Sequence, residues 1–381
     1  MPDILMIGDT ERSADLRHEV PLQITDAFVY AEVDGRRHVV IWNFELDRIR
    51  ATGIDAELHP MEELRLEELV REGQDAYAAT LAMGLRAVRL LGLRSAVVPR
   101  SFPLGQADHL REHGIELTVD QRLFDDRRRV KSAGELAGIR RALRAAEAGM
   151  ATALELLRAA ERRNGALTVE GETLTCELIK ERVERDFVRH GCSTDEFIVS
   201  HGPQTAIGHD MGSGPIVPDD LVMLDLFPRD RASACFADMT RTFAVGAVPD
   251  EIREYHRLSK QALELCVESI RPGLSGADLH RSVCELFEAH GHPTQLSKPE
   301  GAVLLDGFYH ATGHGVGLGV HEQPGIGRFG EPLVAGDVLA IEPGLYRHGF
   351  GGVRLEDLVL VTEDGCEVLT NFPYDLEVAS K

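Results

Sequence analysis

Hydrophobic and polar positions follow two different periods along the first third of the chain. Residues 26–42 read DAFVYAEVDGRRHVVIW, two runs rich in β-branched and aromatic residues that meet at Asp34-Gly35. An Asp-Gly pair between such runs predicts a β-hairpin. Residues 75–91 carry apolar positions at helical spacing, and a strand at 95–98 and a further helix–strand unit to residue 119 follow. The pattern predicts a leading α/β domain without an evident catalytic cluster.

A charged segment, LFDDRRRVK at 123–131, separates this part from the rest of the chain. It predicts a connector with a boundary near residue 128, and therefore domains at 1–128 and 129–381. Ser132 and Glu135 form a capping-box pattern that predicts a long helix to about residue 162. A second helix is expected at about 174–189, ended by Gly191. The remainder is strand-rich, with further helices expected at about 250–271 and 276–290.

Composition narrows the possible partners. The 381 residues allow two or three domains, and a hydrophobic content of 43% is typical of a globular chain. A formal net charge of −22 disfavours binding to nucleic acid and to anionic membranes. The six cysteines are scattered without CxxC pairs, which predicts reduced thiols. No secretory signal and no apolar run of about 18 residues is evident, so the expected location is cytoplasmic.

Acidic side chains stand at the ends of apolar runs in the last third of the chain, and one histidine lies among glycines. The candidates are Asp225 in VMLDLF, Asp238 in FADMTRTF, His314 in TGHGVGLGVHE, Glu342 in LAIEPGLY and Glu356 in the predicted strand VRLEDL. Four carboxylates and one imidazole suit two divalent ions, which can turn water into a nucleophile at neutral pH. If these side chains converge, the protein is a hydrolase.

Each candidate taken alone has a simpler explanation. A single Asp at a strand end is usually a turn or cap residue. Arg354 lies two residues from Glu356 and shares its strand face, so an Arg–Glu ion pair competes with metal binding. The glycines around His314 do not form a dinucleotide-binding GxGxxG, because Leu318 occupies the third glycine position. Only the combination of the five favours a metal site.

Four strings in combination carry a specific resemblance: DMTRTF, TGHGVGLGVHE, IEPGLY and VRLEDLVLVTEDG. They resemble the pita-bread metallopeptidase family of creatinase, aminopeptidase P and prolidase, in its Xaa-Pro peptidase branch. The resemblance covers about residues 130–381. It implies an α+β protein, in which a C-terminal pita-bread domain with a curved antiparallel sheet and flanking helices follows an α/β creatinase-type N-terminal domain.

The resemblance also implies a ligand set for two divalent ions. Asp225 would bind one ion, His314 and Glu342 the other, and Asp238 and Glu356 would bridge both. The donor chemistry favours manganese, with cobalt, iron or zinc as alternatives, because oxygen donors outnumber nitrogen donors.

Catalytic roles follow from the same resemblance. Glu342 would transfer the proton of the attacking water, and His209 and His321 would contact the substrate. Arg354 would orient Glu356 or Asp238. His310 matches a histidine often present in prolidases, and its role stays open.

The implied activity is hydrolysis of the peptide bond between an N-terminal residue and proline by a hydroxide that bridges the two metal ions, in a homodimer. Aminopeptidase P, which accepts longer peptides, and prolidase, which accepts dipeptides, both remain open. A methionine aminopeptidase-like enzyme and a non-catalytic peptide-binding module on the same fold are the alternatives.

One stretch departs from the family pattern. The segment between Asp225 and Asp238 is two residues longer than is usual there. Because side-chain direction along a strand has a period of two, this extension keeps both carboxylates on one face. The expected consequence is an altered hairpin tip, including Arg229 and Asp230, with the ligand pair preserved.

Overall fold

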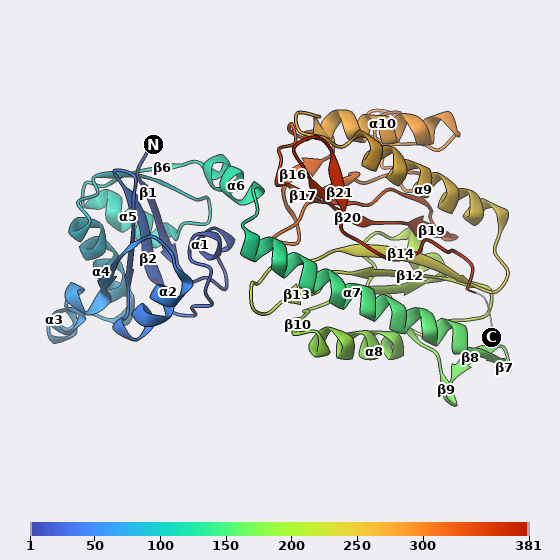
Figure 1. Cartoon of the computed structure of the whole chain (residues 1–381), viewed down its shortest axis with the longest axis horizontal. Coiled ribbons are helices and arrows are strands. Elements are labelled where there is room, and N and C mark those ends of the chain that lie inside the picture. Colours follow the sequence, from blue (N-terminus) through green and yellow to red (C-terminus); the bar gives the residue numbers. More distant parts are fainter. Residues whose placement is uncertain (1, 379–381) are drawn as a thin grey trace. The chain divides into compact units, whose positions relative to one another are not determined.

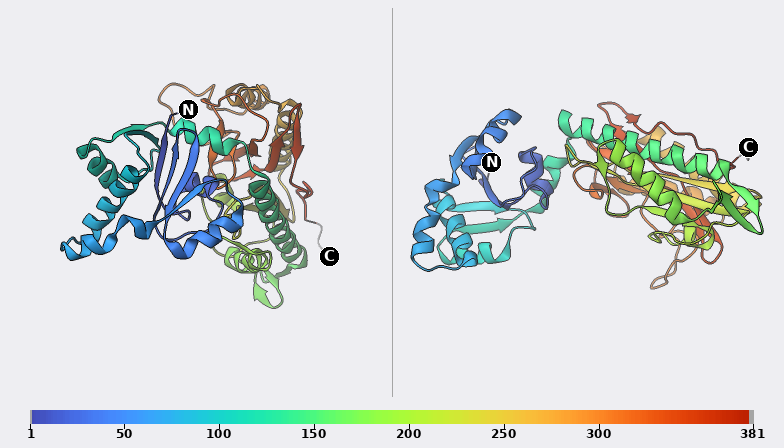
Figure 2. Two further views of the ribbon diagram at one scale, coloured as in Figure 1. Left: turned by 60° about the vertical axis from the view of Figure 1, so that its left-hand side comes forward. Right: turned by 90° about the horizontal axis from the view of Figure 1, so that it is seen from below.

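A computed structural model describes residues 2–378 (Figure 1), and Figure 2 gives two further views. The chain divides into two compact units, one ending at Arg128 and the other beginning at Arg129. Among the described residues, no helix has the combined length and apolar content needed to cross a bilayer. Helices and sheets are both well represented in the two units, which makes the protein α+β as expected.

A six-stranded mixed sheet forms the centre of the first unit, in the order β4-β3-β2-β1-β5-β6. Its strands are β1 (Ile4–Gly8), β2 (Phe28–Val33), β3 (Arg36–Ile41), β4 (Glu57–Pro60), β5 (Ser95–Val98) and β6 (Glu116–Val119). The predicted hairpin is confirmed as the antiparallel pair of β2 and β3. Asp34 (φ 51°) and Gly35 (φ 77°) form its turn, in the left-handed region that Asp-Gly tolerates. Strand β4 extends the sheet by pairing parallel with β3, and it forms the edge.

Among the described residues, six α-helices accompany this sheet. They are α1 (Ala14–Glu19), α2 (Leu46–Thr52), α3 (Leu66–Arg71), α4 (Ala76–Leu90), α5 (Leu104–Glu112) and α6 (Gln121–Arg129). Helix α4 confirms the helical periodicity of residues 75–91, and Asp75 caps it by accepting from the backbone N–H of Ala78. The segment 123–131, predicted to connect the two domains, is mostly helical: α6 covers it as far as Arg129, and the division between the two units falls after Arg128. Side-chain pairs within one turn, such as Arg128 with Asp125 at 3.0 Å, stabilise this highly charged helix.

The described part of the second unit, residues 129–378, contains four α-helices: α7 (Ala133–Ala159), α8 (Cys176–Arg189), α9 (Asp250–Ser269) and α10 (Gly276–Ala289). The capping box of Ser132 and Glu135 is present at the start of α7. That helix ends three residues before the predicted position, because residues 161–163 form a strand of a small hairpin instead. Helices α7 and α8 pack together, α7 also contacts β12 and β14, and α9 and α10 lie together on the other side of this unit (Figure 1).

Short antiparallel sheets make up the rest of the second unit. One contains β11 (Ile198–His201), β12 (Asp220–Leu226) and β14 (Met239–Val245). A second contains β15 (Gly313–Gly315), β16 (Glu322–Ile326), β17 (Val338–Ile341), β20 (Asp357–Val361) and β21 (Cys366–Val368). Three smaller groups are β18 (Gly344–Arg347) with β19 (Gly351–Arg354), β10 (Cys192–Ser193) with β13 (Arg229–Asp230), and β7 (Glu161–Arg163), β8 (Ala166–Val169) and β9 (Glu172–Thr173).

The chain changes sheets twice near its C-terminal end. Strand β17 of the five-stranded sheet ends before Glu342, and the chain then enters the two-stranded sheet of β18 and β19. Strand β19 ends before Leu355, and the chain returns to the five-stranded sheet as β20. The single strand expected around Glu356 is therefore wrong. The two crossing points lie together, since the backbone N–H of Leu355 donates to the carbonyl of Pro343. Both crossing points carry a candidate ligand.

Candidate metal centre

Two of the predicted ligands lie on one face of the β12–β14 pair. Asp225 is directly opposite Thr240 in the antiparallel register, and Asp238 lies two residues before Thr240. Because alternate residues of a strand point to the same face, Asp225, Asp238 and Thr240 share that face. Neighbouring strands thus hold both carboxylates on a rigid base, as the sequence predicted.

The other three predicted ligands come from the sheet that contains β15, β17 and β20. His314 is the central residue of β15, Glu342 follows β17 and Glu356 precedes β20. Backbone hydrogen bonds fix the last two: the N–H of Glu342 donates to Thr312 O at 2.9 Å, and the N–H of Glu356 donates to Thr240 O at 3.1 Å. The second of these bonds joins this sheet to the one that carries the aspartates.

The five side chains converge. His314 Nε2 lies 3.8 Å from Asp238 Oδ2 and 3.7 Å from Glu342 Oε1. One donor atom each of Asp238, His314 and Glu356 falls within 4.8 Å of the others. Asp225 joins them on the wall of one cavity of about 750 Å³ that all five line. We refer to these five residues as the ligand cluster.

Hydrogen bonds orient the side chains of two members of the ligand cluster, His314 and Glu356. A carbonyl oxygen can only accept, so His314 Nδ1 donates to Gly315 O, at 3.2 Å, and the lone pair of Nε2 faces the carboxylates. The hydroxyl of Thr240 donates to Glu356 Oε2 at 2.7 Å. Thr240 is not among the residues predicted from the sequence, although its position two residues after Asp238 predicts the same strand face.

Arg354 forms a different ion pair from those expected. Its guanidinium donates to Asp225 Oδ2 at 2.6 Å and contacts the hydroxyl of Tyr346 at 3.3 Å. Among the described residues it forms no direct ion pair with Glu356 or Asp238, but its Nε donates to Thr240 Oγ1 at 3.4 Å, and Thr240 in turn donates to Glu356 Oε2, so the expected effect on Glu356 passes through Thr240. A simple Arg–Glu pair therefore does not explain the buried Glu356.

Burial perturbs the ionisation of the cluster. Burial raises the pKa of Asp238 well above its usual value, and the charges of Glu356 and Asp225 raise it further. Burial likewise raises the pKa of Glu356 well above its usual value, with Asp225 adding to the effect. The pKa of Glu342 rises to about 7 through burial, which Arg354 partly offsets. Burial lowers the pKa of His314 to about 4, so its ring is neutral at pH 7.

The cluster fits divalent cations on structural grounds. Among the described residues, the buried oxygens Oδ1 of Asp225 and Oδ1 of Asp238 have no hydrogen-bond partner. Unsatisfied buried carboxylate oxygens are costly unless they bind a cation. Four carboxylates carry −4 when ionised and Arg354 supplies +1, which leaves −3 for two divalent ions to neutralise. An oxygen-rich donor set with one imidazole suits such ions.

Three further histidines surround the cavity. His209 and His321 are exposed residues on its lining, and the ring of His321 stands edge-on to His314 with centroids 4.3 Å apart. His310 lies deeper, with Nε2 at 2.8 Å from the hydroxyl of Tyr346. Burial lowers the pKa of His310 to about 3 and keeps it neutral. Tyr346, which links His310 to Arg354, is a second residue that the sequence analysis missed.

The two-residue extension folds away from the cavity at its tip. Asp230 accepts from the guanidinium of Arg141 on helix α7 at 3.0 and 2.8 Å, and Arg229 Nε donates to Ala234 O at 2.9 Å. Only Phe227, at the beginning of the segment, lines the cavity. The aspartate pair is preserved, as strand parity predicted.

This fold and this cluster define a metallopeptidase-type site. The sequence profile of metallopeptidase family M24 matches residues 137–363, which include all five members of the cluster. The chain therefore belongs to metallopeptidase family M24.

Individual relatives agree with this assignment. A Xaa-Pro dipeptidase of Pyrococcus furiosus is 34% identical over 185 residues, a match that spans 47% of this chain and 48% of the relative. A Xaa-Pro dipeptidase of Pyrococcus horikoshii is 27% identical over 297 residues, 75% of this chain and 76% of the relative. The crystal structure of an X-Pro aminopeptidase from Thermotoga maritima has a TM-score of 0.77 at 21% identity, covering 99% of this chain and 97% of that one. This likeness shows the shared fold.

Proposed function

We propose that this protein is a dinuclear metal-dependent Xaa-Pro peptidase of the prolidase type, which hydrolyses the peptide bond before proline. The observation that carries the proposal is the ligand cluster at the wall of a cavity of about 750 Å³, in which Oδ1 of Asp225 and Oδ1 of Asp238 have no hydrogen-bond partner among the described residues. That volume lies within the ordinary range for small-molecule sites, so it suits a short peptide. The names of the Pyrococcus relatives support Xaa-Pro dipeptides as the substrate class.

The ligand cluster would hold two divalent ions, with Asp238 and Glu356 between them. Bound there, such ions supply Lewis-acid polarisation of a carbonyl and lower the pKa of water. Manganese is the proposed metal, because carboxylates outnumber imidazole in the donor set. Arg354 holds Asp225 and Thr240 holds Glu356, so each carboxylate keeps one orientation.

The remaining chemistry belongs to side chains at the cavity wall. Glu342 lines this wall, with Oε1 3.7 Å from His314 Nε2, and there it would accept the proton of the attacking water and return it to the leaving amine. His209 and His321 lie at the same wall as Glu342, where their ring N–H groups would donate hydrogen bonds to the carbonyl of the substrate and stabilise the charge that develops on it.

Three peptides separate the candidate activities. Purified protein loaded with Mn²⁺ is assayed on Ala-Pro, Ala-Pro-Ala and Met-Ala-Ala. Cleavage of Ala-Pro alone supports the prolidase type, and preference for Ala-Pro-Ala would assign the aminopeptidase P type instead. Turnover of Met-Ala-Ala alone would overturn proline specificity. Absence of turnover by protein with two verified metal equivalents would favour a peptide-binding module.

A homodimer in the cytoplasm completes the proposal, on the basis of the sequence resemblance. Light scattering coupled to size exclusion tests the dimer: a mass near 84 kDa, twice the chain mass of 41.9 kDa, supports it, and a monomer mass contradicts it. Fractionation of the source cells tests the location.

A further inference from the structure

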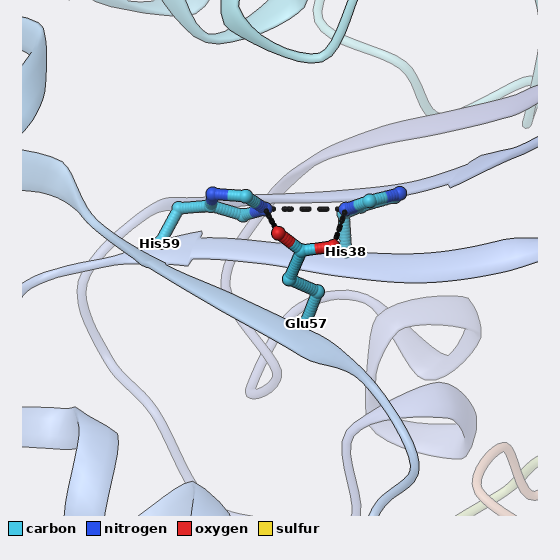
Figure 3. A group of neighbouring side chains, drawn as sticks. All are labelled: His38, Glu57 and His59. Carbon is cyan, nitrogen blue, oxygen red and sulfur yellow. Dashed lines mark hydrogen bonds and ion pairs between the residues drawn. The ribbon is translucent and has the colours of Figure 1, made fainter.

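A second group of potential metal ligands lies in the first unit, outside the ligand cluster. His38 on β3 and Glu57 and His59 on β4 bring their donor atoms within 4.8 Å of one another. Figure 3 shows one nitrogen of each imidazole ring turned toward the other ring, with the Glu57 carboxylate beside the pair and one oxygen directed at each ring. Nothing in the sequence pattern singled out these residues, because His38 lies 19 positions before Glu57.

The strand register accounts for the convergence. In the parallel pair of β3 and β4, His38 is the partner of Glu57, and His59 lies two residues further along β4. Residues two apart on a strand point to the same face, so Glu57 and His59 project beside His38. The three side chains are therefore placed by the sheet, which is a rigid support for a ligand set.

The distances match a shared ion. His38 Nδ1 and His59 Nε2 lie 3.1 Å apart. Two nitrogen ligands of a tetrahedral zinc ion, each at about 2.0–2.1 Å, are separated by about 3.3 Å. Glu57 places Oε2 at 3.7 Å from the His38 nitrogen and Oε1 at 3.9 Å from the His59 nitrogen. Small rotations of the exposed Glu57 side chain would bring one of its oxygens to about 3.3 Å from each nitrogen, the separation of two ligand atoms around a tetrahedral zinc ion.

The surroundings suit coordination as well. The histidine side chains are 13% and 16% exposed, whereas Glu57 is 61% exposed, so the rings are held by packing while solvent reaches the carboxylate. His38 Nδ1 and His59 Nε2 are directed at the same point, and imidazole binds metal ions through the lone pair of such a ring nitrogen.

We propose that His38, Glu57 and His59 form a second metal site that takes a borderline transition ion, with zinc foremost, and that water completes its coordination. Two imidazoles and one carboxylate favour Zn²⁺, Ni²⁺ or Cu²⁺ over Mn²⁺, whereas the ligand cluster, with four carboxylates, favours Mn²⁺. The chain thus carries two sites of different metal preference. In the first unit the ion joins edge strand β4 to β3 and stabilises the edge of the sheet.

The test counts zinc in the full-length protein. Wild-type protein and the double variant His38→Asn/His59→Asn are equilibrated with Zn²⁺, freed of unbound metal by gel filtration and analysed by plasma mass spectrometry. The double variant is expected to hold one zinc equivalent fewer per chain, with unchanged peptide hydrolysis in Mn²⁺. His113→Asn, which changes an exposed histidine elsewhere in the first unit, is the matched control and is expected to retain the wild-type content.

Two further measurements keep the proposal falsifiable. Glu57→Gln alters an exposed side chain and is expected to weaken retention of the same zinc equivalent by about 10-fold or more. Anomalous diffraction at the zinc edge from wild-type crystals soaked in Zn²⁺ is expected to show a peak between His38 Nδ1 and His59 Nε2. Equal zinc contents in wild type and double variant, or no anomalous peak at these rings, would overturn the proposal and leave a plain histidine–histidine hydrogen bond. Neither result depends on peptidase activity.

Discussion

The guanidinium of Arg354 donates to Asp225 Oδ2 at 2.6 Å, across two different sheets of the second unit. Arg354 is itself 3% exposed, so this charged hydrogen bond forms in a buried setting where it is strong. It leaves Oδ1 of Asp225 without a partner among the described residues. One oxygen is thus fixed by the protein and the other has its lone pairs unused, which is the arrangement that a metal ligand requires.

Replacing Arg354 by Lys is expected to lower Mn²⁺ affinity by about 10- to 100-fold, because a lysine ammonium cannot reach Asp225 and Tyr346 with the fixed geometry of a guanidinium. Isothermal titration of metal-free protein with Mn²⁺ measures the change. Arg347→Lys, at an ion pair with Glu251 on a more exposed surface, is the matched control and is expected to bind as wild type. Wild-type affinity in Arg354→Lys would contradict the positioning role.

The hydroxyl of Thr240 is expected to contribute more to metal affinity than its methyl group does. Thr240→Val keeps the shape of the side chain but removes the donor to Glu356 Oε2, and should lower metal affinity about 10-fold. Thr240→Ser retains the hydroxyl and should recover most of the affinity. If Val and Ser variants bind Mn²⁺ equally well, the hydrogen bond does not orient Glu356.

Glu342→Gln is expected to reduce kcat by about 10²- to 10⁴-fold, because the amide cannot accept a proton from water. The assay uses Ala-Pro and protein whose metal content is verified, since Glu342 is also a proposed ligand. Circular dichroism should show the wild-type fold. A wild-type kcat in a variant that holds two metal equivalents would contradict the proposed role of Glu342.

The stability of the metal-free protein should depend on pH in a defined direction. Folded Asp238, Glu342 and Glu356 have raised pKa values, so they bind more protons than the unfolded chain above about pH 4. The stability associated with their protonated forms is lost as pH rises through the folded pKa values, which for Glu342 is about 7.

His314 acts in the opposite sense, because its folded pKa is lowered to about 4, but that effect is largely complete above about pH 6.5. The unfolding temperature without metal should therefore fall between pH 6.5 and 8. Saturating Mn²⁺ should raise it more at pH 8 than at pH 6.5, since fewer protons compete for the carboxylates. Equal metal-induced shifts at the two pH values, measured by calorimetry, would contradict this account.

Much of the site was predictable because its residues stand in short, specific strings. Strand parity alone placed Asp225 and Asp238 on one face despite the two-residue extension, and the resemblance identified His314, Glu342 and Glu356 as candidates. The partner of Arg354 was not predictable in this way, since it depends on where the chain leaves one sheet for another. The same applies to Tyr346, whose contacts with His310 and Arg354 join separate segments.

The sequence by itself determined the features that depend on interactions between residues close together in the chain. The Asp-Gly turn, the capping box at Ser132 and the helical periods of α4, α8, α9 and α10 all follow from interactions within a few residues of each other. Tertiary structure decided the rest. The chain passes from one sheet to another at Glu342 and again just before Glu356, and these changes depend on pairing between segments that are distant in sequence. The same is true of the parallel register that places His38 beside Glu57. Such pairing brings charged side chains together in buried or packed surroundings. It cannot be predicted from a short sequence pattern, because the paired segments lie far apart in the chain.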